Sequence, residues 1–129
     1  ILVFAFGGRA AILDGNVKRV LARLRGIEGY PGETAVAARL WRDAEALLPE
    51  KNLVAYTQGL MDLGATVCTR RRPRCGECPV SAFCAALATD RVSALPTPKP
   101  RKALPQRRTM MLVLQRAGEI LLEKRPPAG

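Results

Sequence analysis

Apolar residues recur at helical spacing through the first two-thirds of the chain. In the segment 17–27, the positions i, i+3, i+4, i+7 and i+10 are all apolar and form one face of a helix: Val17, Val20, Leu21, Leu24 and Ile27. Asp14 stands just before this face and is a favourable N-cap residue. The pattern therefore predicts an amphipathic helix that begins at Asp14 and ends near the glycines Gly26 and Gly29.

Similar stripes predict further helices on either side of this one. An apolar segment over residues 1–8 closes at a Gly-Gly pair, a second stripe runs over 34–48, and a third runs over 52–67. We expect Trp41, on the second stripe, to be a core residue, as an aromatic side chain on an apolar face usually is. A short helix is expected over 84–88.

The pattern changes after residue 92. Residues 93–107 hold four prolines and four Lys or Arg, which predicts a stiff, extended linker. The segments TMMLVLQ and EILLEKR then flank Arg116-Ala117-Gly118 and predict a β-hairpin. We therefore expect a mainly α domain over 1–92, a linker over 93–107 and the start of a second domain over 108–129. Because both ends of the chain fall beside apolar segments, we expect a fragment of a longer protein.

Positive charge is concentrated in the second half of the sequence. Residues 68–129 contain 13 Lys or Arg against 4 Asp or Glu, whereas residues 1–67 contain 8 against 7. A surplus of this kind favours a polyanionic partner, and nucleic acid is favoured over a membrane because no basic amphipathic helix stands out. A solvated basic surface without a partner is the alternative. No apolar run approaches the ~20 residues of a membrane span.

All four cysteines lie within residues 68–84, spaced C-x6-C-x2-C-x5-C: Cys68, Cys75, Cys78 and Cys84. Two disulfides are possible, but nothing indicates secretion. A structural zinc site is also possible, although zinc favours two close pairs and the chain has no His. A [4Fe-4S] cluster takes four thiolates, one on each iron, and longer loops suit its width. The spacing alone favours the cluster only modestly.

The first loop of this segment is rich in arginine. Cys68 and Cys75 enclose six residues that include Arg70, Arg71, Arg72 and Arg74. A loop fixed at both ends would present these cations to a phosphate backbone in a set geometry. Partial compensation of the thiolate charge is the alternative.

The cysteine spacing, together with LDGNVKRVLAR at 13–23 and MDLGATVCTRRRPRC at 61–75, resembles the helix-hairpin-helix DNA glycosylases that carry an iron–sulfur cluster. Within them, these segments look like the A/G-specific adenine DNA glycosylases. The tail, with LPQRR, a strand and LLEKRPPAG, is similar to the start of that family's Nudix-like α+β domain.

The resemblance implies a function in base-excision repair. The family hydrolyses the N-glycosidic bond of adenine mispaired with 8-oxoguanine or guanine in double-stranded DNA. Asp14 matches its catalytic aspartate, Asn16 matches a polar residue near the sugar, and the four cysteines match its [4Fe-4S] ligands. Lys18 and Arg19 join the arginine loop as expected DNA contacts. A bacterial, cytoplasmic, nucleoid-associated monomer without membrane contact is the expected setting.

Two parts of the family pattern have no counterpart in the sequence. The Glu that protonates the base and the G-V-G hairpin belong upstream of Ile1. We therefore expect the 129 residues alone to be inactive, although the parent protein is an enzyme. The alternatives are a non-enzymatic four-cysteine module that binds DNA, and a glycosylase/lyase of the endonuclease III type.

Overall fold

Helices dominate the structure, a computed structural model that describes residues 2–100, 106 and 108–124. The elements are, in chain order, α1 (Leu2–Phe6), α2 (Gly15–Leu24), α3 (Thr34–Ala46), α4 (Leu53–Asp62), the π-helical turn η1 (Leu63–Val67), the 3₁₀ turns η2 (Cys75–Glu77) and η3 (Ser81–Phe83), α5 (Ala85–Ala88), and the strands β1 (Gln115–Arg116) and β2 (Glu119–Ile120). The described part is mainly helical with one small sheet, which confirms the predicted helical class.

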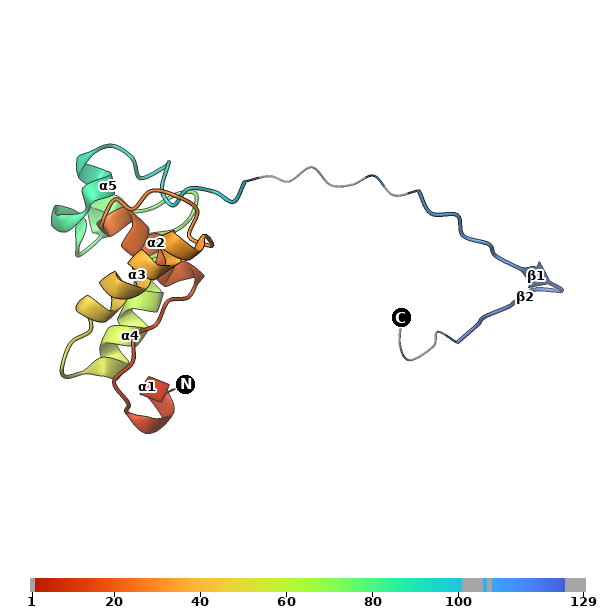
Figure 1. Ribbon diagram of the computed structural model, residues 1–129, viewed down its shortest axis with the longest axis horizontal. Helices are drawn as coiled ribbons and strands as arrows, with labels where there is room; N and C mark the ends of the chain where they lie inside the picture. Colours follow the sequence, from red (N-terminus) through yellow and green to blue (C-terminus); the bar gives the residue numbers. More distant parts are fainter. Residues whose placement is uncertain (1, 101–105, 107, 125–129) are drawn as a thin grey trace.

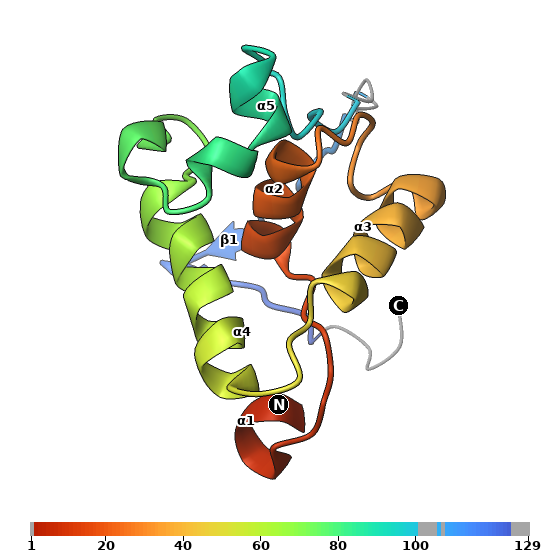
Figure 2. The same ribbon diagram turned by 90° about the vertical axis from the view of Figure 1, so that its left-hand side faces the viewer.

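Helix α2 lies at the centre of the helical part. It contacts α3, α4, η1 and α5, and Figure 2 shows it between α3 on one side and α4 on the other. Its apolar face supplies half of the buried core, which consists of Val17, Leu21, Ala22, Ile27, Leu40 and Ala44. Burying such side chains stabilises a fold by roughly 1.5–3 kcal/mol each. The predicted face of this helix is therefore confirmed, and it organises the packing of its neighbours.

The predicted helix boundaries hold with small changes. Helix α2 starts directly after Asp14, and α1 ends at Gly7, which has a φ of +62°. The stretch expected as one helix over 52–67 is divided into α4 and η1. The π turn at η1 adds one residue to the hydrogen-bonded ring, so that Cys68 N donates to the carbonyl of Leu63 over 2.7 Å.

The prediction for Trp41 is wrong, because 43% of this side chain is exposed. The buried face of α3 is set by Leu40 and Ala44, which are 0% and 3% exposed and lie four positions apart. Trp41 follows Leu40 by one position, which turns it about 100° around the helix axis. The apolar pattern of the sequence predicted a wider buried face on α3 than the neighbouring helices cover.

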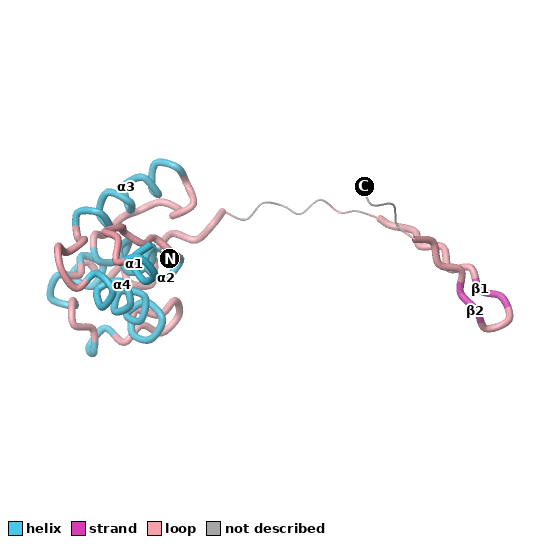
Figure 3. Tube along the Cα trace, turned by 90° about the horizontal axis from the view of Figure 1, so that it is seen from below, coloured by secondary structure: helices cyan, strands magenta, loops and turns pink. Residues whose placement is uncertain are grey.

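Residues 115–120 form a β-hairpin, as predicted, but with shorter strands. The strands are antiparallel, with Gln115 opposite Ile120 and Arg116 opposite Glu119, so Arg116 lies in a strand and outside the turn. Ala117 and Gly118 both have positive φ, +52° and +83°, as a two-residue type I′ turn requires. Figures 1 and 3 draw the hairpin apart from the helices. LPQRR and the final RPPAG lie largely outside the described residues.

Candidate functional site

Asp14 caps the central helix. Its backbone is extended, with ψ of −177°, and its Oδ1 accepts a hydrogen bond from the backbone N–H of Val17 over 2.7 Å. This bond satisfies one of the N–H groups that a helix start leaves without a partner. The side chain is exposed, so its carboxylate is fixed in position by the helix and remains accessible at the surface.

The first turns of α2 are joined to the beginning of the cysteine segment by Arg19. Its Nη2 donates to Asn16 Oδ1 over 2.8 Å and to the Gly64 carbonyl over 2.6 Å, and its Nε donates to the Cys68 carbonyl over 2.7 Å. Burial lowers the pKa of the Arg19 guanidinium, and the nearby positive charge of Arg23 lowers it further. The donors of Arg19 are thus used inside the protein, and its predicted contact with DNA stays a prediction.

Gly64 allows α2 and η1 to approach closely at this point. A Cβ atom built on Gly64 would lie 2.7 Å from Asn16 Cβ and 3.1 Å from the Asn16 carbonyl oxygen. These distances are too short for any larger residue without a shift of one element. The glycine therefore places Asn16, two residues after Asp14, directly against η1, the element that Cys68 follows.

Short turns fold the cysteine segment into a compact wrap. The Arg74 N–H donates to the Val67 carbonyl over 2.9 Å and closes the first loop, while η2 begins at Cys75 and α5 follows Cys84. All four cysteines are free thiols, so the disulfide alternative is wrong. They line one shared recess, to which Arg23 also contributes.

The four cysteines are neighbours around this recess. Burial raises the pKa of the Cys75 thiol, the other three cysteines raise it further, and the positive charge of Arg23 lowers it. Yet no three Cys, Asp or Glu side chains in the described part of the chain converge closely enough to hold one metal ion. Four soft sulfur donors spread around a small recess suit an iron–sulfur cluster better than tetrahedral zinc.

Three of the four arginine side chains in the loop make no hydrogen bond or ion pair with the described part of the chain. Arg70, Arg71 and Arg72 are exposed, whereas Arg74 donates to the Thr66 carbonyl over 2.8 Å and pairs with Glu77 over 2.9 Å. Arg74 therefore supports the loop, and the other three arginines remain available at its surface.

A groove connects this loop to the start of α2. Its lining includes Gly15 at the first turn of the helix, Arg70 and Arg71 from the loop, and Lys99 from the linker. Lys18 is half-buried on α2. The fold thus brings two cations of the loop and one of the linker to the groove that reaches Gly15, the residue after Asp14, a juxtaposition that the sequence did not reveal.

Arg23 is the residue of this region that sequence reasoning missed. It lies in the last turn of α2, is only 3% exposed, and donates to Cys68 Sγ over 3.3 Å. Its position three residues after Val20 places it on the buried face, and a charged residue at such a position is the signal that could have identified it.

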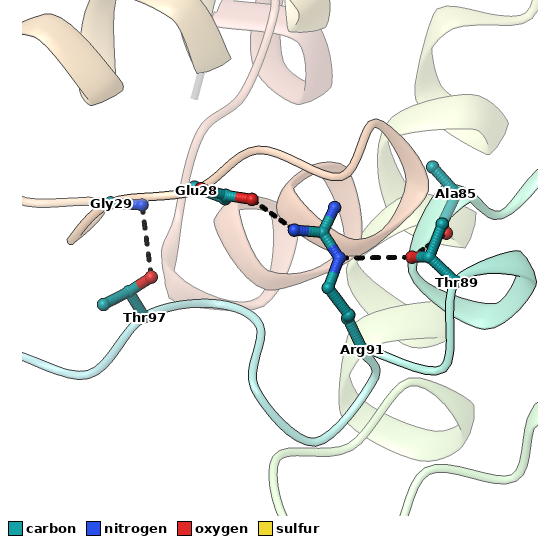
Figure 4. Close-up of polar contacts among 6 residues, drawn as sticks. All are labelled: Glu28, Gly29, Ala85, Thr89, Arg91 and Thr97. Carbon is teal, nitrogen blue, oxygen red and sulfur yellow. Dashed lines mark hydrogen bonds and ion pairs between the residues drawn. The ribbon is translucent and has the colours of Figure 1, made fainter.

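The start of the predicted linker is held against the helical part. The Gly29 N–H donates to Thr97 Oγ1 over 3.1 Å, and Arg91 pairs with Glu28 (Figure 4). Leu95 is 3% exposed, and its carbonyl accepts from Arg23 Nε over 2.8 Å. Residues up to about 97 are therefore packed with the helices, while the domain boundary at 92 stays a prediction.

Comparison with known proteins relates these features to a family. A family model described as the iron–sulfur binding domain of endonuclease III matches residues 68–84. The adenine DNA glycosylase of Buchnera aphidicola is 34% identical over 113 residues, which cover 88% of this chain and 33% of that protein. The human adenine DNA glycosylase is 44% identical over 86 residues, covering 67% of this chain and 16% of that protein. The chain therefore spans a third or less of the length of these two relatives.

A solved structure of a DNA glycosylase is also similar to this chain. A thermostable thymine-DNA glycosylase superposes with a TM-score of 0.59 at 34% identity, over 68% of this chain and 40% of that one. The helical fold and the four-cysteine segment together define the iron–sulfur class of DNA glycosylases. Within that class, the chain matches a part of the adenine DNA glycosylases. The cofactor of its cysteine segment is a [4Fe-4S] cluster. None of the described helices has the length and apolar character needed to cross a bilayer.

Proposed function

We propose that this chain forms part of an enzyme that removes adenine from A:8-oxoguanine or A:G mispairs in double-stranded DNA by hydrolysis of the N-glycosidic bond. The observation that carries the proposal is the position of Asp14, a fixed and exposed carboxylate that directly precedes Gly15, which lines a cationic groove. The similarity of the chain to adenine DNA glycosylases supports the choice of base.

The proposed role of Asp14 follows from the charge that develops on the sugar. When the bond between the sugar C1′ and adenine breaks, its electrons leave with the base and the sugar becomes oxocarbenium-like. A carboxylate on the opposite face stabilises that cation until water adds to C1′. Asp14 stands at a helix N-terminus, where a negatively charged side chain is favourably placed. We propose that Asn16, whose Oδ1 accepts a hydrogen bond from Arg19, helps to orient the first turn of α2, which Asp14 caps.

The groove lined by Arg70, Arg71 and Lys99 supports the proposed DNA contact. Arginine and lysine bind phosphate oxygens without reading sequence, and the loop arginines can thereby position the duplex over Asp14. We include Arg72 and Lys18 as further phosphate contacts, and Arg74 as the support of the loop. Substituting any one of the phosphate-binding cations by a neutral residue should make the plot of log K against log salt less steep by about 1.

We assign Cys68, Cys75, Cys78 and Cys84 as the four ligands of the [4Fe-4S] cluster. When bound, the cluster supplies four metal–sulfur bonds that tie the segment into one shape. The cysteines hold it, and the loop arginines gain a fixed geometry from that attachment. A protein with Cys78→Ser is expected to lose the visible absorbance of the cluster and to bind DNA more weakly.

The remaining organisation is proposed from sequence similarity. We place residues 1–92 in the glycosylase domain, 93–107 in a linker, and 108–129 at the start of a Nudix-like domain, of which the hairpin β1–β2 would be the first part. The enzyme would act as a monomer on the nucleoid of a bacterial cytoplasm.

The test is base release by the natural gene product that contains this chain, purified with its cluster. Duplexes carrying A:8-oxoguanine, A:G, A:T or T:G are incubated with the protein under single-turnover conditions. The abasic sites that base release leaves are then cleaved, and the cleaved DNA is measured. We expect release of adenine from the first two, and a loss of at least about 100-fold with Asp14→Asn. Asp43→Asn, on α3, is the matched control and should stay active.

Three outcomes would replace the proposal. Release of thymine from T:G, instead of adenine, would favour the base specificity in the name of the structural neighbour, a thymine-DNA glycosylase. A covalent adduct trapped by borohydride would indicate a lyase of the endonuclease III type. Binding of DNA without release of any base would favour a non-enzymatic module. The 129-residue chain alone is expected to release no adenine.

A further inference from the structure

Arg23 places a positive charge inside the protein. Only 3% of the residue is exposed, and an arginine side chain stays protonated in proteins. Burial of an unpaired charge is costly, so buried charges are ordinarily paired or bound to a metal centre. A negatively charged group is therefore expected near Arg23, and the contacts of its side chain identify that group.

Backbone carbonyls accept most of its hydrogen bonds. Nε donates to Leu95 over 2.8 Å, Nη1 donates to Thr69 over 2.7 Å, and Nη2 donates to Arg70 over 3.3 Å. These contacts hold the start of the arginine loop and the start of the linker against α2. Carbonyl oxygens solvate a cation but carry no net charge, so they leave the charge of Arg23 unbalanced.

No carboxylate pairs with Arg23 in the described part of the chain. The two ion pairs found there are Arg74 with Glu77 and Arg91 with Glu28. Among the described residues, the one contact of Arg23 that can carry a full negative charge is Cys68 Sγ, 3.3 Å from Nη1. The backbone carbonyl of Arg23 also lies 3.5 Å from the Sγ of a second cysteine, Cys84.

We propose that Arg23 is a positioning residue for the iron–sulfur cluster, where it donates an N–H···S hydrogen bond to the Cys68 thiolate and raises the reduction potential of the cluster by its buried charge. Hydrogen bonds to the sulfurs and nearby charge are among the factors that set such potentials. A cation favours the state with one more electron, so its removal should lower the potential. The inference rests on Cys68 as a ligand, and it is independent of the reaction on DNA.

The experiment compares charge and shape at this position in the 129-residue chain with its cluster bound. Arg23→Gln removes the charge, Arg23→Lys keeps it, and Arg39→Gln makes the same charge change at an exposed position on α3. Cluster content is measured from iron and visible absorbance. The midpoint potential is measured by voltammetry, in which each cluster takes one electron from the electrode.

We expect Arg23→Gln to lower the ratio of reduced to oxidised cluster about tenfold at a fixed potential, which for one electron is about 59 mV. Arg23→Lys and Arg39→Gln should stay close to the unmodified chain. Loss of the cluster in Arg23→Gln but not in Arg23→Lys also supports the proposal, because Lys keeps the positive charge that Gln lacks.

Two results would overturn it. The first is an unchanged potential in a fully loaded Arg23→Gln protein. The second is equal loss of the cluster from the Gln and Lys variants, which would assign Arg23 to backbone support alone. A Cys68→Ala protein tests the ligand assignment separately: if it loads a full cluster with an unchanged spectrum, that assignment has failed, and the inference with it.

Discussion

Asp14 has two roles that substitution can separate. As an N-cap it accepts a hydrogen bond from the Val17 N–H, and as a carboxylate it places negative charge at the start of α2. Asp14→Ala removes both, whereas Asp14→Asn keeps an oxygen that can accept the same hydrogen bond and removes only the charge. The two variants should therefore differ in stability but share the loss of adenine release.

The expected loss of stability follows from these two roles of Asp14. Loss of an N-cap hydrogen bond costs about 1 kcal/mol, and loss of a favourable charge at a helix N-terminus costs about 0.3–1 kcal/mol. Because α2 contacts most of the other helices, this cost should appear in the unfolding of the whole helical part. For a unit of this size, 1 kcal/mol lowers Tm by about 4–8 °C. We expect the unmodified chain to have the highest Tm, Asp14→Asn a lower Tm and Asp14→Ala the lowest.

Thermal and urea unfolding of the cluster-loaded chain, followed by circular dichroism, would measure this order. Asp43→Ala on α3, where the aspartate caps no helix start, serves as the control. Equal Tm values for the Ala and Asn variants would refute the capping argument. Normal adenine release by the Asn variant in the natural gene product would refute the electrostatic one.

Three further predictions concern the surroundings of this helix. Gly64→Ala should lower the free energy of unfolding by about 1–3 kcal/mol, because its Cβ would meet Asn16 at 2.7 Å; Gly59→Ala, a helix position with open space, should instead raise it by about 0.5–1 kcal/mol, and urea unfolding of the pair checks both. Arg19→Gln should lower it by at least about 1–3 kcal/mol, because part-buried carbonyls lose their donors, and retention of full stability would contradict that reasoning. Burial raises the pKa of Tyr56, so the unfolded chain loses that proton first and stability should fall as pH rises above about 10; Tyr56→Phe should reduce the fall, as measured by unfolding at several pH values.

The helices were predictable because their signal is local. The face from Val17 to Ile27 and the cap at Asp14 depend on residues within a few positions of one another, and both are confirmed. The stripe on α3 was predicted too wide at Trp41, because the width of a buried face depends on which neighbours cover it. That information lies in tertiary packing and has no local signal.

The candidate site divides in the same way. Cysteine spacing and the arginine loop could be read from residues 68–84 alone, and the family match confirms the type of cofactor. The internal roles of Arg19 and Arg23 could not be predicted, since their partners lie 45 to 72 positions away. An arginine on a helix gives no sequence sign of whether it faces solvent or a distant carbonyl.

The packing of residues 93–97 changes how the chain can be divided. A truncation after Val92 would remove the buried Leu95 and the acceptor of Arg23 Nε. It would also leave the Gly29 N–H without Thr97. Such a deletion would act on the protein as a mutation in its interior, although it falls in a proline-rich stretch of sequence. A shortened helical fragment should therefore extend at least to Thr97, five residues beyond the point where the helical pattern stops.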